Sequence, residues 1–93
     1  MRTCYLDCRD MTDRAALHAC LREALSLPDW YGNNLDALYD CLSEPGEETT
    51  IVVTHTQALD RLEGDYGRRF LDTLVDASRE NPALRVLAYW SVE

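Results

Sequence analysis

The feature that most constrains the fold is a run of β-branched residues, TTIVVTH at 49–55, with a helical pattern on each side of it. Such a run is typical of a strand buried in a sheet. Two further segments, RTCYLD at 2–7 and RVLAYWSV at 85–92, also have the composition of strands. Strands that alternate with helices are joined by right-handed crossovers and form a parallel sheet. The sequence therefore predicts an α/β fold with a small three-stranded parallel sheet.

Four helices are predicted between these strands. In the first, MTDRAALHACLREAL, apolar residues recur with the spacing of one helix face, and Thr12 is the expected N-cap. Asn33 is the expected N-cap of the second helix. The expected element order is β-α-α-β-α-α-β in a single domain that spans residues 1–93. The second, third and fourth helices are expected over residues 34–43, 56–62 and about 66–80.

The charge of the chain limits its possible partners. The 93 residues carry 17 acidic side chains against 9 basic ones, all of them arginine, for a net charge of −8. Such a surface repels phosphates, so we expect no nucleic-acid binding and favour basic partners. No apolar run approaches the roughly 20 residues of a membrane span, and the N-terminus lacks a signal-peptide pattern. We therefore expect a soluble cytoplasmic protein with no membrane contact.

The four cysteines do not predict disulfides or a metal site. Without an export signal, we expect reduced thiols that pack as small apolar groups. Cys4 and Cys8 would lie about 13 Å apart on an extended strand, too far for a pair of zinc ligands. We expect the same reduced state for Cys20 and Cys41, and no metal or cofactor.

The second predicted helix carries an unusual charge pattern. On a helical projection, Leu35, Leu38 and Leu42 gather on one side, and two aspartates lie on the opposite side. Asp36 lies near the helix start, where the macrodipole favours an acid. Asp40 lies past the middle, repels Asp36 by about 0.2–0.5 kcal/mol, and has no basic residue within helical reach. A solvated surface and a binding site both explain this face on these grounds.

The fourth predicted helix and the loop before the second add to the pattern. Asp72, Asp76 and Glu80 follow one another at i, i+4 and i+8, with Thr73 beside them. Arginines on the same helix could neutralise this ridge, so a solvated surface is favoured there. The Trp-Tyr pair at 30–31 lies in a loop that exposes at least one aromatic ring, and exposed aromatics beside acids suit protein recognition.

The stretch LPDWYGNNLDALYDCL at 27–42 resembles the barstar-like family. The match is specific over about sixteen residues and consists of an aromatic pair, a glycine, Asn-Leu-Asp-Ala-Leu, an aromatic residue and Asp-Cys-Leu. The element order agrees loosely over the whole chain. The resemblance implies that the protein is an intracellular inhibitor and not an enzyme, and that it is monomeric when free. Its partner would be a secreted, basic, guanyl-specific ribonuclease of the barnase type. The second helix and the preceding loop would block the nuclease active site.

The resemblance also implies which residues bind. Asp36 and Asp40 would be the main anchors, with Asp40 closest to the phosphate pocket of the nuclease, and Trp30 would pack on its catalytic region. Trp30 stands where the family pattern has tyrosine, and the turn at 44–45 lacks a Gly-Trp pair, so the cognate enzyme need not be barnase. The implied partner-binding set is Trp30, Asn34, Asp36, Tyr39, Asp40, Thr73, Asp76 and Glu80.

Two other classes of function remain open. A small hydrolase could hold Mg²⁺ with Asp36, Asp40 and Asp76, although no water-activating base is evident. His55 follows the second strand, where α/β enzymes place active sites, but it has no paired nucleophile. His18 is expected at the surface or its boundary. The other class is a regulatory interaction domain that binds a basic partner other than a nuclease.

Overall fold

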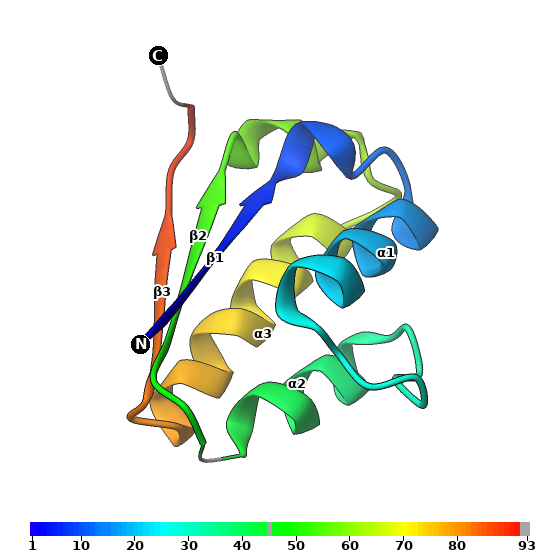
Figure 1. Cartoon of the computed structure of the whole chain (residues 1–93). Coiled ribbons are helices and arrows are strands. Elements are labelled where there is room, and N and C mark those ends of the chain that lie inside the picture. The colour runs from blue at the N-terminus through cyan, green and yellow to red at the C-terminus, as the bar shows by residue number, and fades with distance from the viewer. Residues whose placement is uncertain (45, 92–93) are drawn as a thin grey trace.

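Three parallel strands form the sheet in the computed structural model, which describes residues 1–44 and 46–91 (Figure 1). The strands are β1 (Arg2–Asp7), β2 (Thr49–Thr54) and β3 (Leu84–Ala88), and their order is β1-β2-β3. Both strand pairs are parallel, with Thr49 opposite Arg2 on one side and Leu84 on the other. The predicted three-stranded parallel sheet is confirmed. The last strand ends at Ala88, earlier than predicted, and Val92 lies outside the described residues.

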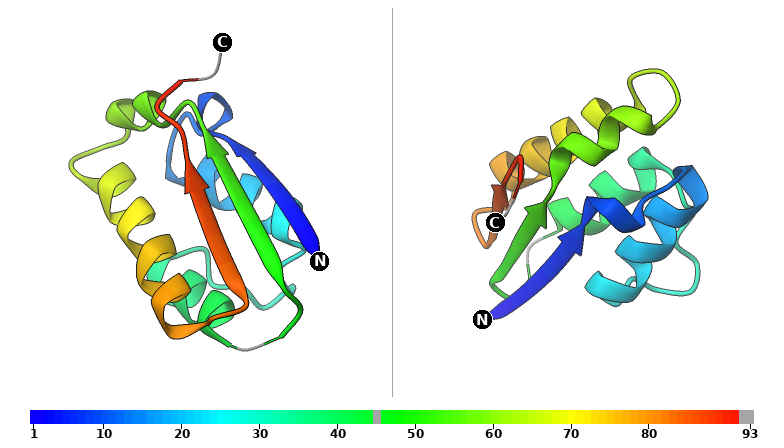
Figure 2. Two further views of the ribbon diagram at one scale, coloured as in Figure 1. Left: turned by 90° about the vertical axis from the view of Figure 1, so that its left-hand side faces the viewer. Right: turned by 90° about the horizontal axis from the view of Figure 1, so that it is seen from above.

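The predicted helices are present, and all of them lie on one face of the sheet (Figure 2). The third is a 3-10 helix, and a further one-turn 3-10 helix follows β1. No helix in the described part of the chain has the length and apolar character that a membrane crossing needs. The elements are η1 (Cys8–Asp10), α1 (Arg14–Leu25), α2 (Leu35–Ser43), η2 (Thr56–Arg61) and α3 (Tyr66–Glu80).

Each predicted N-cap lies one residue away from the observed one. Asp13, not Thr12, caps α1 and accepts a hydrogen bond from the Ala16 amide at 2.8 Å. Asn34, not Asn33, caps α2, because Asn33 has a left-handed backbone (φ 53°) whereas an N-cap is extended. The 3-10 helix η2 starts after His55 without a side-chain cap.

The core lies between the sheet and the helices, so the sheet is covered on one face only. Cys4 and Leu6 of β1 and Ile51 and Val53 of β2 point into this core, whereas the Tyr5 side chain is 72% exposed. The β-branched run of β2 is therefore buried on one face, not on both. The helices contribute Leu17, Leu21, Leu25, Leu35, Leu38, Leu42, Phe70, Leu74 and Ala77.

The four cysteines are free thiols, as predicted. Cys4 and Cys8 are buried, and Cys20 and Cys41 are half-buried. Burial raises the pKa of the Cys8 thiol to about 12, so this thiol stays protonated at neutral pH.

Gly67, in the first turn of α3, allows this helix to approach η2 closely. A Cβ atom at this position would lie 2.7 Å from the Leu59 Cβ and 2.8 Å from the Leu59 carbonyl oxygen. Overpacking of this kind costs about 1–3 kcal/mol, whereas the higher helix propensity of alanine offsets at most about 1 kcal/mol. We therefore expect Gly67→Ala to lower the free energy of unfolding by about 1–2 kcal/mol in urea denaturation.

Gly46→Ala is the control for this prediction, because a Cβ there would meet no atom within 4 Å. If Gly67→Ala proves as stable as Gly46→Ala, then α3 can move away from Leu59 without loss of packing.

Candidate protein-binding site

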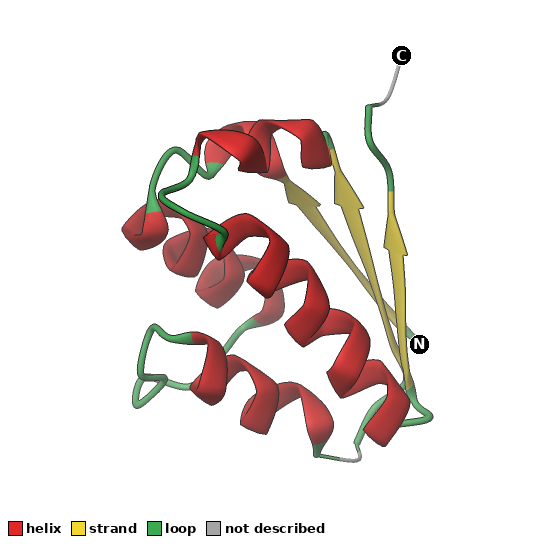
Figure 3. Cartoon of the chain, turned by 180° about the vertical axis from the view of Figure 1, so that it is seen from behind, coloured by secondary structure: helices red, strands yellow, loops and turns green. Residues whose placement is uncertain are grey.

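The candidate site is built on α2 and α3, which pack against each other (Figure 3). Leu35, Leu38 and Leu42 of α2 are buried, as the helical projection predicts. The opposite face of α2 carries Asp36 and Asp40, which are both exposed. The apolar face thus fixes the helix on the core, and the two carboxylates face solvent.

Acids from α2 and α3 meet around the side chain of Tyr39, which is half-buried. Partial burial raises the pKa of the Tyr39 hydroxyl, and nearby negative charge raises it further. That charge comes from Glu80, Asp76 and Asp40, in order of decreasing effect. The structure therefore brings these three acids, predicted as site residues from separate helices, to one acidic surface.

The acidic surface has few counter-ions within the chain. Asp76 pairs with Arg79 at 3.6 Å, but both side chains are more than half exposed, and such pairs contribute little. Among residues 1–44 and 46–91, no basic group lies within ion-pair distance of Asp36 or Asp40. The Arg69 guanidinium lies over the Tyr66 ring instead. The expected neutralisation by arginines is thus limited, in the described residues, to one exposed pair.

Two other predicted site residues make hydrogen bonds inside the protein. The Asn34 side chain accepts from the Ala37 amide at 2.7 Å and donates to the Gly32 carbonyl oxygen at 3.1 Å. The Thr73 hydroxyl donates to the Arg69 carbonyl oxygen at 2.7 Å. Asn34 therefore fixes the start of α2, and Thr73 lies half-buried on α3 with its proton already engaged.

The loop before α2 presents one of its two aromatic rings. Trp30 is 78% exposed, whereas Tyr31 is only 3% exposed. Trp30 and Asp40 line the same surface hollow of about 300 Å³, together with Arg2, Cys41 and Glu44. The loop aromatic and one of the two α2 aspartates therefore face the same surface hollow.

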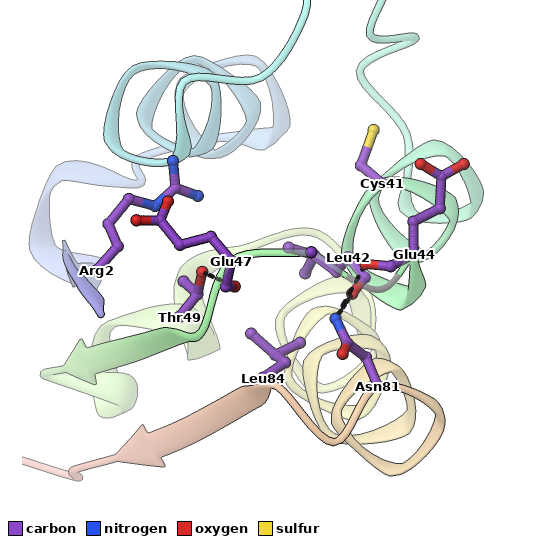
Figure 4. Close-up of a pocket in the computed structure, with 9 residues that line it drawn as sticks. Arg2, Cys41, Leu42, Glu44, Glu47, Thr49, Asn81 and Leu84 are labelled. Carbon is purple, nitrogen blue, oxygen red and sulfur yellow. Dashed lines mark hydrogen bonds between the residues drawn. The ribbon is translucent and has the colours of Figure 1, made fainter.

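The C-terminal end of α2 is held by Asn81, a residue that the sequence analysis did not single out. Its buried side-chain amide donates to the carbonyl oxygens of Leu42 and Glu44 at 3.0 and 3.1 Å (Figure 4). These bonds satisfy carbonyl groups that a helix end leaves without partners. A pocket of about 330 Å³ lies beside this clamp, between Arg2, Glu44 and Asn81. The only sequence signal at Asn81 was the helix end before Pro82.

His18 is buried, not at the surface, with an exposed fraction of 2%. Its Nδ1 and Nε2 atoms lie 2.7 Å from the Tyr31 hydroxyl and 2.5 Å from the Tyr66 hydroxyl. Burial, followed by the nearby Arg14 and Arg22 charges, lowers the pKa of His18. The expectation of a surface position was wrong because hydrogen bonds at both ring nitrogens make burial of the neutral ring favourable.

At the carboxyl edge of the sheet, the described residues do not form a reactive set. The Asp7 carboxylate is engaged by Arg9 at 2.7 Å, and this hydrogen-bonded pair lowers the pKa of Asp7 to about 2. His55 follows β2 with a left-handed backbone. Across the residues that the structure describes, no group of three or more His, Cys, Asp or Glu side chains is placed to hold a metal ion.

The protein is thus of the α/β class, with a parallel sheet that helices cover on one face and an acidic surface on two of those helices. Comparison with known proteins then gives its family. The family model described as barstar (barnase inhibitor) matches residues 1–89. The chain is also 35% identical over 81 residues to the Bacillus subtilis (strain 168) protein named "Putative ribonuclease inhibitor YrdF", an alignment that covers 86% of this chain and 89% of that protein.

The chain therefore belongs to the barstar family, and the resemblance found at residues 27–42 is confirmed. Membership supports a ribonuclease-inhibitor-like role without catalysis.

Proposed function

We propose that this chain is a cytoplasmic inhibitor of a secreted, basic, guanyl-specific ribonuclease of the barnase type. The observation that carries the proposal is the position of Asp40, exposed and without a counter-ion among the described residues, in the same surface hollow as the exposed Trp30. The family model, which is that of a barnase inhibitor, and the printed name of the Bacillus subtilis relative support the same role.

The proposed mechanism is occupation of the nuclease active site by carboxylates. A ribonuclease binds RNA phosphates with basic side chains, and carboxylates accept the same charge-assisted hydrogen bonds. Asp40 enters the phosphate pocket, and Asp36 binds basic groups at its edge. Trp30 packs on the catalytic region of the enzyme. The monomeric inhibitor covers the active site in a one-to-one complex and needs no cofactor.

The remaining residues of the proposed interface surround this centre. Tyr39 supplies an aromatic surface between the helices, and Asp76 and Glu80 add negative charge from α3. Thr73 and Asn34 complete the rim. The acids on this surface repel one another in the free protein, and basic groups of the enzyme remove that repulsion on binding.

The direct test is titration of the chain into a panel of secreted guanyl-specific ribonucleases, barnase included, with residual RNA cleavage as the readout. We expect at least one enzyme to lose its activity at one equivalent of the chain. A basic protein of similar charge without nuclease activity, added as a competitor, controls for non-specific binding. If no enzyme of the panel is inhibited at micromolar excess, a regulatory domain with another basic partner becomes the better explanation.

The charge of the interface predicts a strong effect of salt on association. Complementary surfaces associate at about 10⁸–10⁹ M⁻¹s⁻¹ at low salt, a range based on barnase and barstar themselves. The Debye length falls from about 30 Å at 0.01 M to about 3 Å at 1 M ionic strength. We therefore expect the association rate constant, measured by stopped flow, to fall by about tenfold or more over this range. A rate constant independent of salt would contradict the proposed acidic interface.

A further inference from the structure

A chain of buried hydrogen bonds connects α3, α1 and the loop before α2. The Tyr66 hydroxyl of α3 lies 2.5 Å from Nε2 of His18 in α1, and Nδ1 of His18 lies 2.7 Å from the Tyr31 hydroxyl. The Tyr31 hydroxyl in turn lies 3.5 Å from the carbonyl oxygen of Asn34, the N-cap of α2. All three side chains of this Tyr66–His18–Tyr31 chain are buried.

One proton arrangement satisfies every member of the Tyr66–His18–Tyr31 chain. A neutral imidazole and a tyrosine hydroxyl each donate one proton. With the proton on Nδ1, His18 donates to Tyr31, Tyr31 donates to the Asn34 carbonyl oxygen, and Tyr66 donates to Nε2. In the other tautomer, the Tyr66 proton finds no second acceptor among the described residues, which is unfavourable for a buried hydroxyl. The chain therefore has a direction, from Tyr66 to the start of α2.

The end of this chain lies directly at the proposed interface. Tyr31 follows Trp30 in the sequence, and its amide donates to the Pro28 carbonyl oxygen at 2.9 Å. The Asn34 carbonyl oxygen also accepts the first bond of α2, from the Leu38 amide at 3.0 Å. The position of Tyr31 therefore sets both the loop that exposes Trp30 and the first turn of the helix that carries the aspartates.

The Tyr66 end of the Tyr66–His18–Tyr31 chain lies away from the proposed interface, and packing fixes its position. The Arg14 guanidinium lies 4.1 Å from the centre of the Tyr66 ring, and Arg69 lies 5.9 Å from it. These contacts hold the Tyr66 ring between α1 and α3. The chain thus connects a fixed ring in the helical layer to the segment that binds.

We propose that His18 is a positioning residue of the binding surface, which holds loop 28–34 and the start of α2 in the geometry needed for binding. Its effect on affinity rests on the proposed function, whereas its effect on the loop is a property of the free protein. A loop that is ordered before binding loses less conformational freedom in the complex, so the complex is tighter.

The first test measures amide hydrogen exchange in the free protein. His18→Leu removes both hydrogen bonds, and His18→Gln keeps one donor and one acceptor. We expect exchange at residues 31–38 to rise at least tenfold in His18→Leu and less in His18→Gln, with residues 77–81 of α3 unchanged. The same change at the other histidine, His55→Leu, should leave residues 31–38 unaffected.

The proposal would be overturned if exchange at residues 31–38 stayed at the wild-type rate. It would also be overturned if exchange at residues 77–81 rose by the same factor as exchange at residues 31–38. If His18→Leu does not fold, Tyr66→Phe replaces it in the same measurement, because it keeps the ring and removes only the hydroxyl farthest from the interface. For this variant too, unchanged exchange at residues 31–38 or an equal rise at residues 77–81 would overturn the proposal.

The second test uses barnase as the probe and separates positioning from general stability. We expect His18→Leu to weaken binding about tenfold and His18→Gln to restore most of it. Trp30→Ala should weaken binding less in the His18→Leu background than in the wild type. Asp76→Ala, on α3, should have the same effect in both backgrounds. Equal effects of Trp30→Ala in both backgrounds would overturn the proposal. If barnase does not bind the wild type, the proposed function fails for this enzyme, while hydrogen exchange still tests the role of His18.

Discussion

Asp40→Ala is expected to weaken the ribonuclease complex by a factor of about a hundred or more, which corresponds to at least about 2.7 kcal/mol. The reason is that the basic groups of the nuclease pocket would remain buried without a partner, and truncation of one member of such a pair costs about 2–5 kcal/mol. The free protein should unfold with an unchanged or slightly higher free energy, because the substitution removes a repulsion with Asp36 of about 0.2–0.5 kcal/mol. The change in affinity is measured by inhibition of RNA cleavage, and stability by urea denaturation.

Asp60→Ala is the matched control for this substitution. Asp60 is exposed on η2, outside the acidic surface, so its loss changes the net charge by the same amount. We expect this control to change the association rate slightly and the dissociation rate not at all. An Asp40→Ala protein that inhibits as well as the Asp60→Ala protein would remove the main support for the proposed mechanism.

Trp30→Ala is expected to weaken the complex by about 30-fold to 1,000-fold, or about 2–4 kcal/mol, with most of the change in the dissociation rate. Large aromatic side chains that become buried in an interface contribute most to its affinity. Because the Trp30 side chain is 78% exposed in the free protein, its removal should leave the free energy of unfolding almost unchanged. Surface plasmon resonance with an immobilised nuclease gives both rate constants.

The second tryptophan provides the control. Trp90 is also exposed, at 67%, but it lies beyond β3 in a hollow formed with η2 and the start of α3. Trp90→Ala should therefore leave the dissociation rate unchanged. Equal effects of the two substitutions would show that the chain uses general hydrophobic contacts and not the surface around Asp40.

Much of the fold follows from periodicity in the sequence. The leucines of α2 were predicted because local spacing alone decides which side of a helix is apolar, and β1 and β2 were predicted from their composition, without the face that each strand buries. The N-cap of α2 was misplaced by one residue, since nothing in two consecutive asparagines reveals that Asn33 adopts a left-handed backbone. The coverage of just one face of the sheet depends on how the crossovers pack. A β-branched run in the sequence does not predict that packing.

Some features of the candidate site were likewise predictable from the sequence, and others were not. The exposure of Asp36 and Asp40 follows from the helical projection, and the structure confirms it. The contact between His18 and Tyr66 joins residues 48 positions apart, so no local pattern predicts it. Asn81 likewise reaches across 39 positions to Leu42. Buried polar contacts of this kind depend on the tertiary structure, and one sequence gives no sign of them.

The contacts that hold α2 have a consequence for how the acidic surface can evolve. A helix of nine residues is marginal in isolation, so α2 is ordered by its leucines, its Asn34 cap and the Asn81 clamp. None of these contacts uses the outward side chains at Asp36 and Asp40. If these residues bind a nuclease as proposed, their mutation would retarget the surface to a different enzyme at little cost in stability, because the scaffold does not depend on them.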